Sequence, residues 1–368
     1  MKLIHTADLH LHSAFVQFPK EKAKIRGEET LQTFARLADF AKREGVYGVL
    51  IAGDFFDSNR VPNYIKRRAL SIVAEAAPVR FFYITGNHDN KAFDSFDTLP
   101  DNFLRFDKSN GFFTYELPEN ITVSGVDYDA SGDAGVYRSL SLAEEKFNIV
   151  MMHGTLSRSE YPDKEAVCLP NLTGRRIDYL ALGHIHNPPS AAALDTRGVY
   201  RYAGCLEGRG FDEAGEKGAY LLEIKGGKLV FERFLKFSER TVYEITVDVS
   251  GVLDVFGLQS KILESAAKVS RNDVVKIVLK GNIPAEKRGE FSRVAALLDG
   301  RFFHSKIEDN TKIEINIAAY AKDVSLRGEF VRGISSAPIL EKSGLTEEVR
   351  LEALAFGLAA LAGEEIDV

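Results

Sequence analysis

Five short motifs rich in Asp, His and Asn carry the residues of this chain that could do chemistry. They are Asp8-Leu9-His10, Gly53-Asp54, Gly86-Asn87-His88-Asp89, His153-Gly154 and Gly183-His184-Ile185-His186. Carboxylate, imidazole and amide donors without a thiolate suit manganese, iron or zinc better than calcium. Two such ions about 3.5–4 Å apart can clamp a phosphate and generate a hydroxide between them at neutral pH. The residue types therefore indicate a two-metal phosphoesterase site in which one carboxylate bridges the metals.

Each motif follows a short, mostly apolar run, such as KLIHTA before Asp8 or FNIVMM before His153. Runs with little alternation are typical of strands that are buried on both faces of a sheet. Ligands bind at the carboxyl ends of strands in open α/β sheets, so we expect the five motifs to meet at one edge. The sequence thus predicts an α/β sandwich over residues 1–237, with two stacked mixed sheets and helices outside.

The elements between the motifs follow from periodicity and turn residues. Amphipathic helices are predicted over 28–44 and from Pro62 to about Ala77. Strands are expected between Asn110-Gly111 and Gly125. Antiparallel strands are expected over 190–235, with a hairpin turn at Gly226-Gly227.

A second unit is predicted over 239–320. It contains a strand in RTVYEITVDVS, a helix at about 254–269, a strand in VVKIVLK, a helix over 285–298 and further strands near 302–317. Residues 321–368 form a tail with two amphipathic helices, at about 323–333 and 347–362, the second capped by Thr346. The tail helices either pack on this chain or dock on a partner, and the sequence leaves both open.

Taken together, the motifs resemble those of the calcineurin-like metallophosphoesterases, most of all the SbcD-type DNA repair exonucleases and their shorter YhaO-like form. The order D-x-H, G-D-x-x-D, G-N-H-D, H-G and G-H-x-H is complete between residues 8 and 186. The resemblance implies a role for each motif residue: Asp8, His10 and His186 on the first metal, Asn87, His153 and His184 on the second, Asp54 as the bridge, His88 as the acid that protonates the leaving oxygen, and Asp89 as the group that orients His88.

Four more residues are candidates near the substrate: Arg209, Arg60, His12 and Asp57. Arg209 stands between two glycines, so it is either a phosphate contact or part of an ordinary turn. Arg60, with Lys66, Arg67 and Arg68, either tracks a phosphate backbone or forms a solvated helix face. His12 could contact substrate or belong to a surface loop. Asp57 could support a metal ligand or cap its loop.

The family resemblance implies a metal-dependent DNA nuclease, most simply an exonuclease that hydrolyses phosphodiester bonds in DNA repair or end processing. It implies two divalent ions, Mn²⁺ first, with Fe²⁺, Zn²⁺ or Mg²⁺ as other choices. Residues 239–320 would be the capping domain. The implied partners are DNA and an SMC-like ATPase of the SbcC or YhaN type, and a homodimer is a further option. The alternatives are a small-molecule phosphodiesterase or phosphatase on the same core, or a regulatory scaffold for the ATPase.

Composition and charge restrict the remaining choices. The net charge is −6, so the chain lacks the global basic character of nucleic-acid binders that work alone, and a partner is expected to supply much of the grip on DNA. One further basic cluster, Lys20 to Arg26, precedes the first helix. Two Cys without CxxC spacing favour a reducing, cytoplasmic setting. No apolar run reaches the length of a membrane span, and a signal peptide is not expected. His5 is expected to be a core residue.

Overall fold

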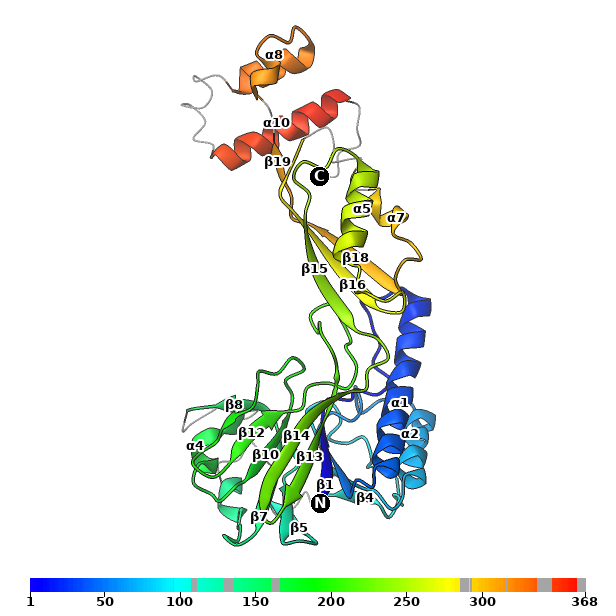
Figure 1. Cartoon of the computed structure of the whole chain (residues 1–368), viewed down its shortest axis with the longest axis vertical. Coiled ribbons are helices and arrows are strands. Elements are labelled where there is room, and N and C mark those ends of the chain that lie inside the picture. The colour runs from blue at the N-terminus through cyan, green and yellow to red at the C-terminus, as the bar shows by residue number, and fades with distance from the viewer. Residues whose placement is uncertain are drawn as a thin grey trace. The chain divides into compact units, whose positions relative to one another are not determined.

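The computed structural model describes residues 1–94, 96–106, 111–128, 135–159, 166–284, 291, 293–314, 317–335 and 346–362. The chain divides into two compact units, Met1–Thr241 and Val242–Val368. Their elements are labelled in Figure 1. Within the described residues, no helix is both long enough and apolar enough to cross a membrane.

Among the described residues, unit 1 is built on two six-stranded mixed sheets. The first has the order β14-β13-β1-β2-β3-β4: Lys228–Lys236, Gly218–Lys225, Lys2–Thr6, Gly48–Ala52, Arg80–Ile84 and Phe103–Arg105. The second has the order β11-β12-β10-β7-β6-β5: Ala192–Ala193, Val199–Tyr202, Tyr179–Gly183, Phe147–His153, Ile121–Gly125 and Phe113–Leu117. The expected α/β class with two mixed sheets is confirmed.

The motif-bearing strands are parallel to their neighbours. Strands β1, β2, β3 and β4 run parallel in the first sheet, and β6, β7, β10 and β12 run parallel in the second. The antiparallel pair β13–β14 turns at Gly226-Gly227, as predicted. Strands β11 and β12 are also antiparallel to each other, as predicted for the stretch 190–235, and β12 in addition pairs parallel with β10, which lies before this stretch.

Apolar side chains explain the layering. One core cluster joins Leu3, Leu50 and Phe82 of the first sheet to Ile149 and Met151 of the second, so the two sheets pack face to face. A second cluster joins the other face of the first sheet to helices α1 (Lys20–Arg43) and α2 (Asn63–Glu75). Both helices lie together beside this sheet in Figure 1. Strands β2, β7 and β10 are buried along their whole length, which accounts for their continuous apolar sequence.

The first helix is longer than predicted, because it begins at Lys20 after Pro19 rather than at residue 28. Its extra turns are held by Arg26, which is fully buried and hydrogen-bonded to Glu29 and Glu207. Arg26 is therefore not part of a surface cluster with Lys20, Lys22 and Lys24. Among its described residues, unit 1 also contains four short elements: η1 (Val136–Ser139), β8 (Thr155–Ser157), β9 (Ala166–Cys168) and α4 (Leu169–Leu172).

Unit 2 contains a parallel three-stranded sheet, β15-β16-β18, at Val242–Asp248, Val274–Lys280 and His304–Asp309. Helices α5 (Val255–Ser265) and α7 (Val294–Leu297) accompany it. Strands β17 (Asn282–Pro284) and β19 (Lys312–Glu314) pair beside η3 (Ile317–Tyr320). Half of the helix predicted over 285–298 lies outside the described residues, and its described part contains α7.

The tail helices are α8 (Leu326–Ile334) and α10 (Glu347–Ala362). Thr346 Oγ1 accepts the Val349 N–H at 3.4 Å, so the predicted N-terminal cap is present. Val331 of α8 and Leu354 and Leu358 of α10 are buried in one cluster, against which Ile317 and Tyr320 pack. Part of the apolar surface of the tail is thus covered within unit 2.

Candidate metal centre

The predicted ligands meet where parallel strands end. Asp8 and His10 follow β1, Asp54 follows β2, and Asn87 and His88 follow β3. His153 is the last residue of β7, and His184 and His186 follow β10. Main-chain hydrogen bonds join these ends, from Asp8 N to Gly53 O (3.1 Å) and from His10 N to Asp54 O (3.0 Å). The two sheets together therefore deliver all five motifs to one place.

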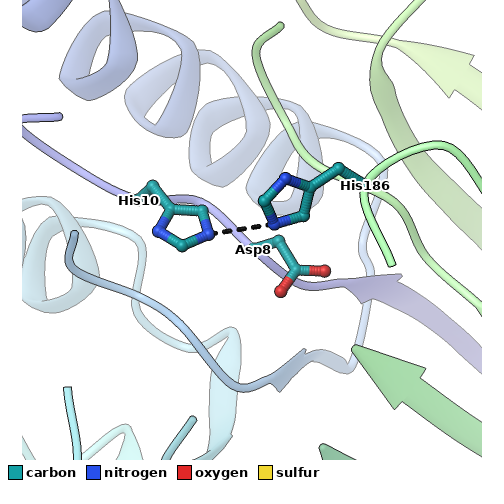
Figure 2. A group of neighbouring side chains, drawn as sticks. All are labelled: Asp8, His10 and His186. Carbon is teal, nitrogen blue, oxygen red and sulfur yellow. Dashed lines mark hydrogen bonds between the residues drawn. The ribbon is translucent and has the colours of Figure 1, made fainter. Parts of the chain in front are cut away.

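One group of possible ligands consists of Asp8, His10 and His186, which Figure 2 draws. One ligand atom from each lies within 4.8 Å of the others. The Nε2 atoms of His10 and His186 face each other at 3.1 Å. Both oxygens of Asp8 accept the main-chain N–H of His184, at 3.0 and 2.9 Å, which fixes the carboxylate.

A second group consists of Asp8, Asp54 and His153. His153 Nε2 lies 3.1 Å from Asn87 Oδ1 and 3.4 Å from Asp54 Oδ2. The same Asp54 oxygen lies 3.6 Å from His10 Nε2. Asp54 thus lies near a histidine of each group, as a bridging carboxylate would, and Asp8 belongs to both groups. The ring of His184 lies beside that of His153, with centroids 5.3 Å apart.

The donor atoms fit cations because their lone pairs converge. His153 Nδ1 lies 2.9 Å from Ala52 O, His186 Nδ1 lies 2.7 Å from a Glu213 oxygen, and His10 Nδ1 lies 3.3 Å from an Asp57 oxygen. Each Nδ1 faces an acceptor, so with a metal bound Nδ1 would carry the proton and each Nε2 would present its lone pair. The Nε2 atoms then lie 3.1–3.6 Å from one another and from the oxygens of Asn87 and Asp54, and either a shared proton or a cation between them offsets the repulsion of the lone pairs.

Burial and neighbouring charges shift the pKa values of the site residues. Loss of solvation raises the pKa of Asp8 to about 6 and lowers that of His10 to about 4. Burial would also lower the pKa of His153, but its hydrogen bond to Asp54 and the charge of Asp54 raise it to about 9. Burial would raise the pKa of Asp54, and His153 and His10 instead hold it below its usual range. The site therefore favours a state in which the buried carboxylate of Asp54 is ionised and is compensated by positive charge nearby.

Four of the proposed ligands have a backbone conformation that is rare for residues other than glycine. Asp8, His10, Asp54 and His184 have φ angles of 50, 41, 49 and 104°, which are uncommon for residues other than glycine. A side chain at Gly86 would collide with Asp54 Oδ1. These sharp turns are stabilised by the packed sheets and aim the ligands inward from the strand ends.

His88 is exposed, and its Nδ1 lies 2.8 Å from the Asp57 carbonyl oxygen. Its ring lies 4.8 Å from that of His10 between centroids, in an edge-on arrangement. The expected orientation of His88 by Asp89 is wrong. Asp89 is fully buried and accepts hydrogen bonds from the N–H groups of Gly86, Phe55 and Phe56 and from Tyr83 Oη. Asp89 therefore holds the loops after β2 and β3 together, and the Asp57 carbonyl orients His88.

The four substrate candidates lie in different settings. The Asp57 carboxylate faces His10 Nδ1 and accepts a 3.0 Å hydrogen bond from Arg209 Nη1, so it supports a predicted ligand. Arg209 is beside the site, engaged by Asp57 and Glu213. His12 is half-buried, and its main-chain N–H donates to Thr30 Oγ1. Arg60 is exposed.

Lys66 does not belong to the basic surface with Arg60. It is 4% exposed, and its ammonium donates to the carbonyl oxygens of Asn59 and Ala92. His5 is fully buried and hydrogen-bonded to Tyr179, as expected for a core residue. Cys168 and Cys205 are free and buried.

Sequence reasoning missed Glu213, whose carboxylate faces the proposed ligand His186. Burial would raise the pKa of Glu213, but its hydrogen bond to His186 and the charge of Arg209 lower it to about 2. Glu213 lies in a loop that contacts the site only after folding. The single signal in the sequence was its closeness to the Gly-rich segment around Arg209.

The fold and the donor set define a metal-dependent phosphoesterase. The chain belongs to the calcineurin-like phosphoesterase family, whose model matches residues 1–188, so the family resemblance of the motifs is confirmed. Members of this family use a dimetal centre.

Two relatives extend beyond the family domain. The chain is similar to an uncharacterized metallophosphoesterase, YhaO, from Bacillus subtilis, with 28% identity over 77% of this chain and 72% of that protein. It is also similar to the DNA double-strand break repair protein Mre11 from Sulfolobus acidocaldarius, with 23% identity over 91% of each chain. A solved dimetal phosphatase from Danio rerio aligns with 61% of this chain and 92% of its own, at 11% identity and a TM-score of 0.42.

Proposed function

We propose that this protein is a metal-dependent DNA nuclease, an exonuclease that hydrolyses phosphodiester bonds in DNA repair or end processing. The observation that carries the proposal is the similarity to a DNA double-strand break repair protein over 91% of both chains, which includes unit 2 as well as the phosphoesterase domain. A metal site alone would fit many phosphoesterases, whereas similarity across both units favours a substrate class that needs both.

In this proposal, the side chains of unit 1 hold two divalent ions. Asp8, His10 and His186 hold one, Asn87, His153 and His184 hold the other, and Asp54 holds both. When bound, such ions polarise a phosphate and activate water at neutral pH. The chain itself fixes the imidazole tautomers through Asp57, Glu213 and the Ala52 carbonyl, so that each of His10, His186 and His153 presents Nε2 as a lone pair.

His88 is proposed as the general acid. The Asp57 carbonyl accepts a hydrogen bond from Nδ1–H, which leaves Nε2–H of the charged imidazole to give its proton to the departing sugar oxygen. The side chain is exposed at the site, so a substrate can reach it without rearrangement of the protein.

The metal, the roles of unit 2 and of the tail helices, and the cellular setting are also part of the proposal. Mn²⁺ is the first candidate metal, because the donor set mixes oxygen and imidazole nitrogen. The part of unit 2 up to residue 320 acts as a capping domain, and the tail helices α8 and α10 provide a surface for an SMC-like ATPase. A cytoplasmic setting suits the two free, buried cysteines.

The test compares substrates with one preparation of the full chain. Purified protein with Mn²⁺ is incubated with end-labelled single- and double-stranded DNA, circular DNA and bis-p-nitrophenyl phosphate, with Asp54→Asn as the metal-deficient control. Degradation from the ends of linear DNA, with circular DNA intact, supports the exonuclease. Hydrolysis of the small ester alone would replace the proposal with a small-molecule phosphodiesterase, and loss of all activity despite bound metal would favour a scaffold.

A further inference from the structure

Three charged side chains outside the proposed ligand set, Arg209, Asp57 and Glu213, form one connected cluster beside the first metal group. Arg209 Nη1 donates to Asp57 Oδ1 at 3.0 Å, and Arg209 Nη2 lies 3.3 Å from Glu213 Oε1. Asp57 Oδ1 also faces His10 Nδ1 at 3.3 Å, and Glu213 Oε1 faces His186 Nδ1 at 2.7 Å. One guanidinium therefore joins the two carboxylates that orient two histidines of the same metal group.

The role of Arg209 depends on whether the Nδ1 atom of His186 carries a proton or accepts one in a hydrogen bond. His186 Nδ1 has two neighbours, Glu213 Oε1 at 2.7 Å and Arg209 Nη2 at 3.0 Å. This nitrogen cannot donate to the carboxylate and accept from the guanidinium at the same time. Donation to Glu213 is shorter and charge-assisted, and it leaves Nε2 free for a metal. Arg209 therefore acts through the carboxylates and not on the imidazole directly.

The loop that carries Arg209 and Glu213 is held in place from both ends. Glu213 Oε2 accepts the main-chain N–H of Arg209 at 2.7 Å. At the start of the loop, Glu207 is 2% exposed, and its carboxylate accepts hydrogen bonds from Arg26 (2.9 Å) and Thr33 (2.5 Å) of helix α1. A buried anion with these donors resists displacement, because moving it would leave a buried charge without hydrogen-bond partners. Arg209 is thus presented to the site on a rigid support.

We propose that Arg209 is a positioning residue for the first metal group, where it fixes the carboxylates of Asp57 and Glu213 and through them the lone pairs of His10 and His186. This replaces the phosphate-contact role that the Gly-Arg-Gly sequence suggested. Arg209 is only 23% exposed, and its donors already face Asp57 and Glu213. The inference rests on the metal-site part of the proposed function and is independent of DNA being the substrate.

The first experiment measures Mn²⁺ binding without substrate. Isothermal titration is performed on Arg209→Gln in an Asn87→Ala background, in which the second site is expected to be weak and the isotherm reports the first. Partners that orient a metal-bound histidine typically change metal affinity by about 10–100-fold. We expect Arg209→Gln to weaken the first site by about that factor. Unchanged affinity would overturn the proposal.

Kinetics of the single Arg209→Gln variant separate positioning from substrate contact. Loss of positioning should lower kcat at subsaturating Mn²⁺ for DNA and for bis-p-nitrophenyl phosphate by the same factor, and excess Mn²⁺ should restore it. A phosphate contact would instead raise KM for DNA alone and reduce the salt dependence of DNA binding by about one counterion. That second pattern would refute the positioning role. A wild-type protein that hydrolyses only the small ester would refute the nuclease while leaving this test valid.

Two further variants, Glu213→Gln and Arg201→Gln, distinguish a specific effect on the metal site from a general loss of folding. Glu213→Gln keeps the shape of the side chain but removes its charge, and it should weaken the same site by a similar factor. Combined with Arg209→Gln, its effect should be less than additive, because Arg209 acts on His186 through Glu213. Arg201→Gln is the matched control, since Arg201 forms a similar partly buried pair with Glu232 away from the metal groups. If Arg201→Gln weakened Mn²⁺ binding equally, or if the Arg209 and Glu213 effects were additive, the proposed linkage would be wrong.

Discussion

His88→Ala tests the proposed chemistry most directly, because His88 is proposed as the acid although it also forms a group of possible metal ligands with His10 and Asp57. His88 is exposed, and its ring makes one hydrogen bond, from Nδ1 to the Asp57 carbonyl. Surface substitutions of this kind change stability by about 0.5 kcal/mol or less, so the variant should fold and bind two Mn²⁺. A positioned general acid contributes about 10²–10⁴-fold in rate, which corresponds to about 2.7–5.5 kcal/mol of the activation barrier.

Two substrates whose leaving groups differ in their need for a proton make this prediction more specific. Cleavage of DNA expels a strongly basic sugar oxygen, which needs a proton, whereas bis-p-nitrophenyl phosphate expels a stable phenolate, which does not. His88→Ala should therefore lose about 10²–10⁴-fold in kcat on DNA and little on the small ester. The assay measures both rates on one preparation, with Lys91→Ala as the control for an exposed neighbour. Equal losses on the two substrates would refute the acid role, and loss of Mn²⁺ would make His88 a ligand.

Three further predictions follow from the site and the two units. Asp54→Asn should lower Mn²⁺ binding at both sites and Asn87→Ala mainly at one, as counted by elemental analysis; full occupancy in Asp54→Asn would remove the bridging role. Burial, helped by the charge of Arg201, lowers the pKa of His5 to about 3, so the unfolded chain takes up a proton below about pH 6.5 before the folded chain does, and stability falls with pH in that window. Wild type should lose about 2 kcal/mol more than His5→Asn between pH 6.5 and 5 in urea unfolding without metal, and parallel curves would contradict this. Removal of residues 322–368 should preserve small-ester hydrolysis, since the proposed ligands all lie in unit 1, but abolish co-purification with an SMC-like ATPase; retained co-purification would place the partner elsewhere.

The candidate ligands could be found from the sequence because their positions depend on local rules. A buried parallel strand has a readable apolar pattern, and the residue after its carboxyl end lies at the ligand-binding edge of the sheet. Asp8, Asp54 and His153 all follow this rule, at the ends of β1, β2 and β7. The helices and strands of unit 2 were also predictable where the apolar pattern was strong, as in β16 and α8. Helix α10 lies where it was expected, but its apolar residues are not confined to one side of the helix, so it is less amphipathic than predicted.

The supporting contacts depended on the tertiary structure. Asp89 was expected beside His88 because the two are adjacent in sequence, but its carboxylate turns inward to four donors from two loops and Tyr83. Arg26 and Lys66 read as surface cations, yet both are buried because carboxylate or carbonyl acceptors from distant segments surround them. Burial of a charge depends on partners that sequence spacing does not reveal.

The sequence by itself determined the strand-end motifs, the residue types of the metal site and the family to which the chain belongs. Only the tertiary structure decided which carboxylate faces which imidazole. Glu213 lies 27 positions from His186 and Arg209 lies 152 from Asp57, so no local pattern joins either pair. The loop of residues 205–213 brings them together, because Glu207 and Arg26 hold its beginning against helix α1 and Glu213 holds Arg209. The positions of the candidate ligands follow from the ends of local strands. The acceptors that face each imidazole nitrogen, and so favour one tautomer, come from long-range packing.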